Sequence, residues 1–205
     1  MFRKLLKIII IQLYSSLIFC QSYEKILILG DSLSDGYGLS VPDQAWPYQL
    51  KETCNLEIEN FSNAGATLQE GVQRLKRYFL NQRDSKILMI ALGSNDGLRG
   101  YPPKAIEHSL KDLIKEAKKI QLIPIIIEWK LPPNYGIYAV HFEKIFKKVA
   151  IDENIGFISF PLEKIATDLS YFQKDQYHPN DKAQKEIAKE ICQGYKNWVI
   201  HQHDL

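Results

Sequence analysis

The chain has 205 residues, of which 45% are hydrophobic and 24% are charged, and its formal net charge is +2. This length favours one domain with a sizeable core, and the composition is that of a soluble globular protein. A charge balance this close to neutral gives no electrostatic reason to expect a nucleic acid or an anionic membrane as partner.

The first predicted element is a leader over residues 1–22. Three basic residues, Arg3, Lys4 and Lys7, precede an apolar run of about 12 residues, which is the layout of a secretory signal peptide. A membrane-spanning helix needs roughly 20 apolar residues, so an N-terminal anchor is the less favoured alternative. Cleavage after Ser22 would leave 183 of the 205 residues, with 23 basic and 24 acidic side chains. We therefore expect an exported protein, periplasmic or secreted, with no stable membrane span once the leader is removed.

The three cysteines bear on where the leader is cut and on whether the mature chain forms a disulfide. A lipoprotein cut before Cys20 is a second alternative for the leader, but Phe19 is bulky where such signals carry a small residue. Cys54 and Cys192 would remain in the mature chain, and two thiols in an exported protein permit one disulfide that the sequence does not establish. The helical apolar pattern around Cys192 favours a plain core position. Neither cysteine lies in a CxxC or CxxH pattern, so we predict no metal site and no cofactor.

After the leader, short β-rich runs alternate with helical patterns. Strands are predicted over 25–29, 56–61, 86–92, 122–127 and 156–160, and helices over 47–53, 67–80, 104–120, 138–154 and 181–198. Pro124 argues for an edge position or an irregular start of the fourth strand. This alternation indicates βαβ units, and hence one α/β domain over residues 23–205 with a parallel sheet covered on both faces.

The strand exits are the places to look for a site. In an open parallel sheet, ligands bind outside the carboxyl ends of the strands, near the point where strand order reverses. The segments that follow the first three strands, 30–32, 60–65 and 93–97, each combine glycine with small polar side chains. Ordinary turns favour the same residues, but three such exits predict a functional site.

A serine nucleophile at the first exit needs a base within hydrogen-bond reach and a third group to orient that base. Of the five histidines, His178 is the best placed, because Asp175 lies three residues earlier and Pro179 follows directly. An Asp-x-x-His turn can bring the carboxylate to Nδ1 and leave the other ring nitrogen free to face Ser32. Read as ordinary loop residues, Asp175 and His178 would leave this grouping unexplained.

Together these segments resemble the four blocks of the SGNH, or GDSL, hydrolase family, in the family's order. The blocks are Gly30-Asp31-Ser32-Leu33, Gly65, Gly93-x-Asn95-Asp96 and Asp175-x-x-His178. Three further stretches, AWPYQL at 45–50, NDGLRG at 95–100 and LPPNYG at 131–136, resemble the periplasmic acyl thioesterase, lysophospholipase and arylesterase subgroup. The resemblance implies a flavodoxin-like, three-layer α/β/α fold with a central parallel sheet of about five strands.

The resemblance also implies roles for individual residues. Ser32 would be the nucleophile, His178 the general base and then general acid, and Asp175 its orienter. The oxyanion hole would consist of the backbone N–H groups of Ser32 and Gly65 and the side-chain amide of Asn95. The chemistry agrees, because preorganised neutral donors stabilise the charge that develops on an attacked carbonyl oxygen.

Three residues next to these candidates are expected to have supporting roles. We expect Asp31 and Asp96 to make hydrogen bonds within their own turns, since an ionised carboxylate is acceptor-only. Ser94 stands where glycine or alanine is common in the subgroup, so details of the acyl pocket can differ there.

The implied reaction is hydrolysis of acyl esters and thioesters through an acyl-serine intermediate. The acyl chain would lie along loops 98–103 and 131–136, which makes Tyr101, Leu131 and Pro132 candidate substrate-binding residues. The expected partner is a small-molecule or lipid ester or thioester, such as a lysophospholipid or an aryl ester, and the protein is expected to be a monomer that binds no nucleic acid. Alternatives are an acetyl esterase acting on carbohydrate or peptidoglycan, and a non-catalytic binding module with a flavodoxin-like fold.

Overall fold

The computed structural model describes residues 25–79 and 84–202, so the predicted leader lies outside the described residues. The strands are β1 (Lys25–Gly30), β2 (Glu57–Asn60), β3 (Ile87–Ala91), β4 (Ile123–Ile127) and β5 (Gly156–Ile158). The helices are α2 (Trp46–Cys54), α3 (Leu68–Phe79), α4 (Ser94–Leu98), α5 (Pro103–Lys119), α6 (Ile137–Glu153) and α7 (Asp181–Gln202). Short 3-10 turns are η1 (Pro42–Gln44), η2 (Pro133–Tyr135) and η3 (Leu169–Tyr171). None of the helices in this described part combines the length and apolar character needed to cross a bilayer.

The sheet confirms the predicted fold class. Its strand order is β2-β1-β3-β4-β5, and every neighbouring pair is parallel. This is the flavodoxin-like order, in which the direction of winding reverses between β1 and β3. The carboxyl ends of β1 and β3 therefore meet side by side at the switch point.

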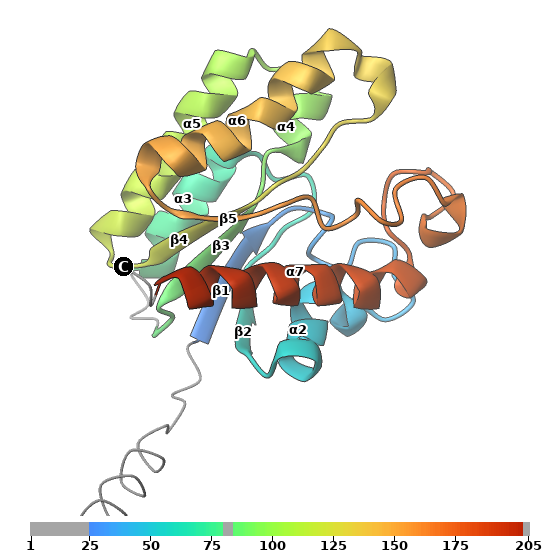
Figure 1. The fold of residues 1–205 in the computed structure, drawn as a ribbon, viewed down its shortest axis with the longest axis horizontal. Coiled ribbons are helices and arrows are strands. Elements are labelled where there is room, and N and C mark those ends of the chain that lie inside the picture. The colour runs from blue at the N-terminus through green and yellow to red at the C-terminus, as the bar shows by residue number, and fades with distance from the viewer. Residues whose placement is uncertain (1–24, 80–83, 203–205) are drawn as a thin grey trace, which may run out of the picture.

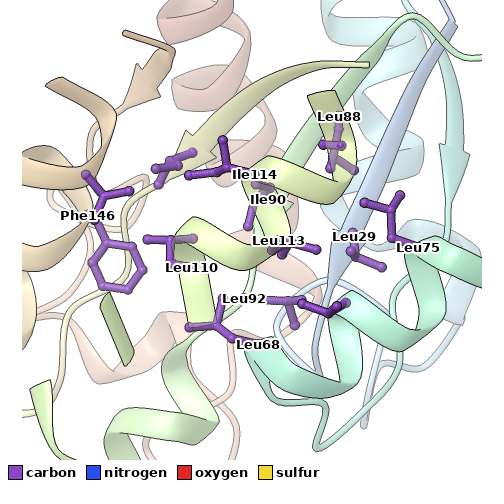
Figure 2. Close-up of a cluster of buried hydrophobic side chains, with 14 of the residues drawn as sticks. Leu29, Leu68, Leu75, Leu88, Ile90, Leu92, Leu110, Leu113, Ile114 and Phe146 are labelled. Atoms are coloured by element: carbon purple, nitrogen blue, oxygen red, sulfur yellow. The ribbon is translucent and has the colours of Figure 1, made fainter. Parts of the chain in front are cut away.

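Helices cover both faces of the sheet, which gives three layers (Figure 1). Helices α3, α5 and α6 lie on one face, and α2 and α7 lie on the other. Because successive residues of a strand point to opposite faces, Leu27 and Leu29 enter the first layer while Ile26 and Ile28 enter the second. Figure 2 shows the first of these cores, with leucines of α3 and α5 packed against β1 and β3.

Helix α3 begins at a reciprocal cap that belongs to the second strand exit. The Thr67 N–H donates to Glu70 Oε2 at 2.7 Å, and the Glu70 N–H donates back to Thr67 Oγ1 at 3.3 Å. This is a capping box, which satisfies backbone donors that have no helical partner. It fixes the chain directly after Gly65, a residue that the family resemblance assigns to the site.

A disulfide joins Cys54 at the end of α2 to Cys192 in α7, with Cα atoms 5.5 Å apart. Cys192 is buried in the core on that face, as its pattern predicted, but it is a bonded half-cystine and not a plain core thiol. The pairing was beyond prediction because α2 and α7 are separated by most of the chain.

All ten predicted elements are present, with small differences at their ends. Strand β4 lies inside the sheet and not at an edge, yet β5 pairs only from Ile125 onward, so Pro124 faces no β5 residue. A missing N–H is therefore tolerated at that position. The five-residue helix α4 was not predicted, because it is too short to show a helical period.

Candidate active site

Three residues from distant parts of the chain form one hydrogen-bonded chain. His178 Nδ1 lies 2.6 Å from Asp175 Oδ2, and His178 Nε2 lies 2.9 Å from Ser32 Oγ. Ser32 directly follows β1 and Asp31, and it is half-buried. The imidazole is 19% exposed and the Asp175 carboxylate 45% exposed, so the pair lies at the rim of the site. A nucleophile, a base and an orienting carboxylate in this order can perform acyl transfer.

The loop that carries His178 is held by its own backbone and by Asp175. The Gln173 N–H donates to the His178 carbonyl at 2.8 Å, and Phe172 forms an antiparallel bridge with Pro179. Asp175 Oδ1 accepts the N–H groups of Tyr177 and His178, both at 3.0 Å. Burial works to raise the pKa of Asp175, but these hydrogen bonds and the imidazole outweigh it and hold the pKa below its usual range. Asp175 is therefore an anion that orients the imidazole.

Contacts that the sequence did not predict join the loop after β1, which carries Ser32, to the segment around His178 and the start of α7. Ser40 donates from its N–H and its hydroxyl to the Asp181 carboxylate, at 3.2 and 3.0 Å. Gln173 Nε2 donates to the carbonyl of Tyr37 at 2.8 Å, and the Tyr37 ring lies 4.8 Å from the His178 ring. These residues come from segments far apart in the chain, so no local pattern predicts their meeting.

The three candidate oxyanion donors differ in the hydrogen bonds that they already make. Within residues 25–79 and 84–202, the backbone N–H groups of Ser32 and Gly65 donate to no protein acceptor. Gly65 has a φ of 76°, in the left-handed region that favours glycine. Asn95 Nδ2 lies 3.1 Å from the Ala66 carbonyl and 3.3 Å from Asp31 Oδ2. These groups come from the exits of β1, β2 and β3, as predicted.

Asp31 does more than make hydrogen bonds within its own turn. Its carboxylate is fully buried and accepts the N–H of Leu33 at 3.0 Å, but it also accepts the hydroxyl of Ser94 and the Asn95 contact given above. Burial raises the pKa of Asp31 to about 6, although the Ser94 and Leu33 hydrogen bonds oppose this rise. A buried carboxylate therefore joins the exits of β1 and β3.

Asp96 does more than the expected hydrogen bonding within its own turn. Its carboxylate interacts with its own backbone N–H, and Asp96 Oδ2 also accepts the N–H of Leu68 at 3.0 Å, so this carboxylate caps α3 from the neighbouring exit. Burial raises its pKa, and the Leu68 hydrogen bond works against that. The contact fastens the second exit to the third.

The loops named as substrate-binding lie next to each other. Tyr135 Oη donates to the Leu98 carbonyl at 3.3 Å, and Tyr138 Oη donates to the Tyr101 carbonyl at 2.6 Å. The three candidate residues differ in access: Tyr101 is exposed, Pro132 is half-buried, and Leu131 is buried in the core beneath the loop.

Metal ligation is not indicated by the described part of the chain, where no three His, Cys, Asp or Glu side chains gather as ligands would. The chemistry available here is that of the hydroxyl, the imidazole and the amide donors.

Comparison with known proteins agrees with the geometry. The family model described as "GDSL-like Lipase/Acylhydrolase family" matches residues 28–185. An "Arylesterase" of Vibrio mimicus is 35% identical over 179 residues, which cover 84% of this chain and 88% of that protein. The "Thioesterase 1/protease 1/lysophospholipase L1" of Escherichia coli (strain K12) is 34% identical over 181 residues, which cover 87% and 86%.

A solved structure extends the likeness to three dimensions. The psychrotrophic esterase EstA from Pseudoalteromonas sp., in a structure inhibited by monoethylphosphonate, has a TM-score of 0.80 at 33% identity. The alignment covers 86% of this chain and 98% of that one. The family match runs from within β1 into α7, so it includes β2 to β5 and the three residues of the hydrogen-bonded chain, Ser32, Asp175 and His178. The chain belongs to the GDSL-like lipase/acylhydrolase family.

Proposed function

We propose that this protein is a serine esterase and thioesterase that works through an acyl-serine intermediate on Ser32. The observation that carries the proposal is the unbroken contact chain from Asp175 through His178 to the Ser32 hydroxyl, at 2.6 and 2.9 Å. A non-catalytic binding module would have no use for this arrangement.

The proposed mechanism follows from the geometry. His178 Nε2 takes the Ser32 hydroxyl proton as the oxygen attacks the acyl carbonyl, and Asp175 stabilises the imidazolium that forms. The carbonyl oxygen becomes an oxyanion, which the Ser32 and Gly65 N–H groups and the Asn95 amide would stabilise. His178 then returns the proton to the leaving alcohol or thiol. Water hydrolyses the acyl-serine by the same steps, which frees the acid and restores Ser32.

The proposed substrates carry a medium or long acyl chain. The groove would run between loops 98–103 and 131–136, where Tyr101 and Pro132 are accessible and Leu131 forms part of the base. The names of the relatives, arylesterase and thioesterase 1/protease 1/lysophospholipase L1, support ester and thioester substrates, lysophospholipids among them. Acetylated carbohydrate or peptidoglycan is the second candidate, and it would not need such a groove.

Export is part of the proposal and rests on two features. The pattern of residues 1–22 is that of a secretory leader, and the Cys54–Cys192 disulfide is typical of proteins from oxidising compartments. Outside the cytoplasm, lysophospholipids and other lipid esters are more accessible than thioesters of coenzyme A. We propose a mature chain over residues 23–205 that acts as a monomer.

A chain-length series tests the proposal. Hydrolysis is measured on p-nitrophenyl esters from acetyl to palmitoyl and on a lysophosphatidylcholine, with Ser32→Ala as the control. We expect the highest kcat/KM at octanoyl or longer, hydrolysis of the lysophospholipid, and a rate for the variant that is at most about 10³–10⁴-fold above water. Activity confined to acetyl esters would favour the carbohydrate substrate, and activity that survives in Ser32→Ala would overturn the assignment of the nucleophile.

A further inference from the structure

One buried anion lies beside the catalytic groups and has no part in the mechanism above. The Asp31 carboxylate has no exposed surface, and Ser94 next to it is 1% exposed. Burying a carboxylate away from water is costly unless it is hydrogen-bonded. A turn after β1 could be made with a neutral residue, so the charge calls for an explanation.

The hydrogen bonds of Asn95 supply one. An amide NH2 group has two hydrogens. In the structure, one is directed at the Ala66 carbonyl, 3.1 Å away, and the other at Asp31 Oδ2, 3.3 Å away. Two acceptors from the exits of β2 and β1 therefore set the plane of the amide. The contact to Asp31 is the longer of the two, so this hydrogen is the one that can be shared with a developing oxyanion.

We propose that Asp31 and Ser94 are positioning residues for the oxyanion amide: the Ser94 hydroxyl holds Asp31 Oδ2, and Oδ2 with the Ala66 carbonyl holds Asn95. The inference rests on the proposed function, because it assumes that Asn95 donates to the oxyanion. Ser94 precedes Asn95 at the start of α4, so the same short helix carries the group that fixes the carboxylate and the group that the carboxylate fixes.

An amide could not replace the carboxylate in this arrangement. Asp31 Oδ1 accepts from the Leu33 N–H, and Oδ2 accepts from Ser94 and Asn95. Both oxygens must be acceptors, and a carboxylate is the side chain that offers two. Asp31→Asn places its NH2 against a donor in either orientation. The Asn95 amide would then turn away from its present plane.

The surroundings of Asp31 also bear on the test. Asp35 in its own loop adds a like charge, while His178 from the opposite loop offsets it when protonated. The charge of Asp31, after burial, helps to raise the pKa of Tyr177 far above its usual range. Because His178 takes up and returns a proton in the proposed reaction, a pH profile of activity would not isolate Asp31, and the test is better made at one pH.

A double-mutant cycle at pH 8 tests the inference. The variants are Asp31→Asn, Asn95→Ala and the double variant, assayed on the best p-nitrophenyl ester. We expect Asp31→Asn to lower kcat by about 10- to 100-fold with little change in KM, since a small displacement of a catalytic group has effects of this size. In the Asn95→Ala background the same substitution should cost less than about 2-fold, because its effect passes through Asn95. Full, independent losses in the double variant would overturn the proposal.

Ser94→Ala gives a second test that does not alter the carboxylate. It removes the hydroxyl that donates to Asp31 Oδ2, and we expect kcat to fall by about 3- to 10-fold. The matched control is Ser85→Ala, which removes another buried hydroxyl, 2.8 Å from Tyr78 Oη, at the opposite end of β3. The control should lose stability and keep its kcat. Equal kcat in wild type and Ser94→Ala would remove Ser94 from the site.

These results are distinguishable from a failure of the proposed function. Covalent labelling of Ser32 by an organophosphonate in the wild-type protein tests the nucleophile and not the positioning role, so a labelled serine with additive losses would reject the positioning role alone. An unlabelled Ser32 would reject the proposed function and the positioning role with it.

Discussion

At the scale of single residues, the site carries an anion where the fold alone would be better served by a neutral group. The pKa of Asp31 rises from 3.8 to about 6 through burial. Because the folded pKa lies above the unfolded one, the folded state binds more protons between these values, and stability contributed by this group falls as pH rises. Burying the ionised form costs about 3 kcal/mol above pH 6. Proteins accept such costs at functional sites.

This cost has a measurable signature in Asp31→Asn, which does not titrate. Between pH 4.5 and 7.5, the free energy of unfolding of wild type should fall relative to that of the variant by about 2 kcal/mol, whatever constant offset the variant adds. Urea unfolding of both proteins at the two pH values measures it. Parallel pH dependences would mean that Asp31 is not titrating in this range.

His178 and Asp175, the two proposed catalytic partners of Ser32, should differ in how much kcat falls when each is removed. His178→Ala removes the base and should bring kcat close to that of Ser32→Ala. Asp175 is 45% exposed, so water can partly replace it, and Asp175→Ala should lose at most about 10⁴-fold in kcat, less than the histidine variant. Single-turnover rates on one ester rank the variants. An Asp175→Ala loss as large as that of His178→Ala would show that the carboxylate is indispensable.

At the scale of elements, periodic patterns predicted the long helices and the strands, but they did not predict short elements or contacts between distant segments. Helix α5 shows its apolar residues at helical spacing, so its range was predicted to within a residue. Helix α4 has five residues and is held by contacts with other elements, among them the space that Gly97 leaves for Phe142 and Leu131. Packing of this kind leaves no periodic pattern in the sequence. Helix α4 was therefore not predicted, even though it carries the candidate oxyanion residue Asn95.

Gly97→Ala tests this dependence of α4 on packing. An added Cβ would lie 2.6 Å from the Phe142 ring and 2.9 Å from Leu131, so we expect a loss of about 1–3 kcal/mol and a lower kcat as α4 shifts. Gly71→Ala is the matched control. Gly71 lies in α3, which carries no proposed catalytic group, and its added Cβ would collide with the side chain of Leu92. Thermal unfolding and kcat are measured together. The account would be contradicted if both variants kept wild-type kcat despite equal losses of stability.

The disulfide is the second non-local feature at this scale. It closes a loop with a sequence separation of 138 residues, so its removal should cost about 3–5 kcal/mol. Cys54 lies at the end of α2 away from the serine loop, so Cys54→Ser should keep its activity at room temperature while its urea midpoint falls. The double variant with Cys192→Ser should match the single one. A further large loss in the double variant would assign the stability to packing of Cys192 and not to the bond.

At the scale of the whole molecule, the fold brings the exits of β1, β2 and β3 to one edge and the loop before α7 over them. The strand alternation predicted the parallel sheet, and the family resemblance implied which exit residues act together. The sequence did not predict which side chains of these segments contact one another. Nothing in the chain indicates that Ser94 meets Asp31, or that Ser40 meets Asp181, because each pair is joined only by the closed fold.

The most direct test of the central claim is the mass of the intact protein after reaction with a fluorophosphonate. The account predicts one adduct per chain, located on Ser32 by peptide mapping, absent from Ser32→Ala and formed much more slowly in His178→Ala. No adduct on the wild-type protein, or an adduct that persists in Ser32→Ala, would contradict it.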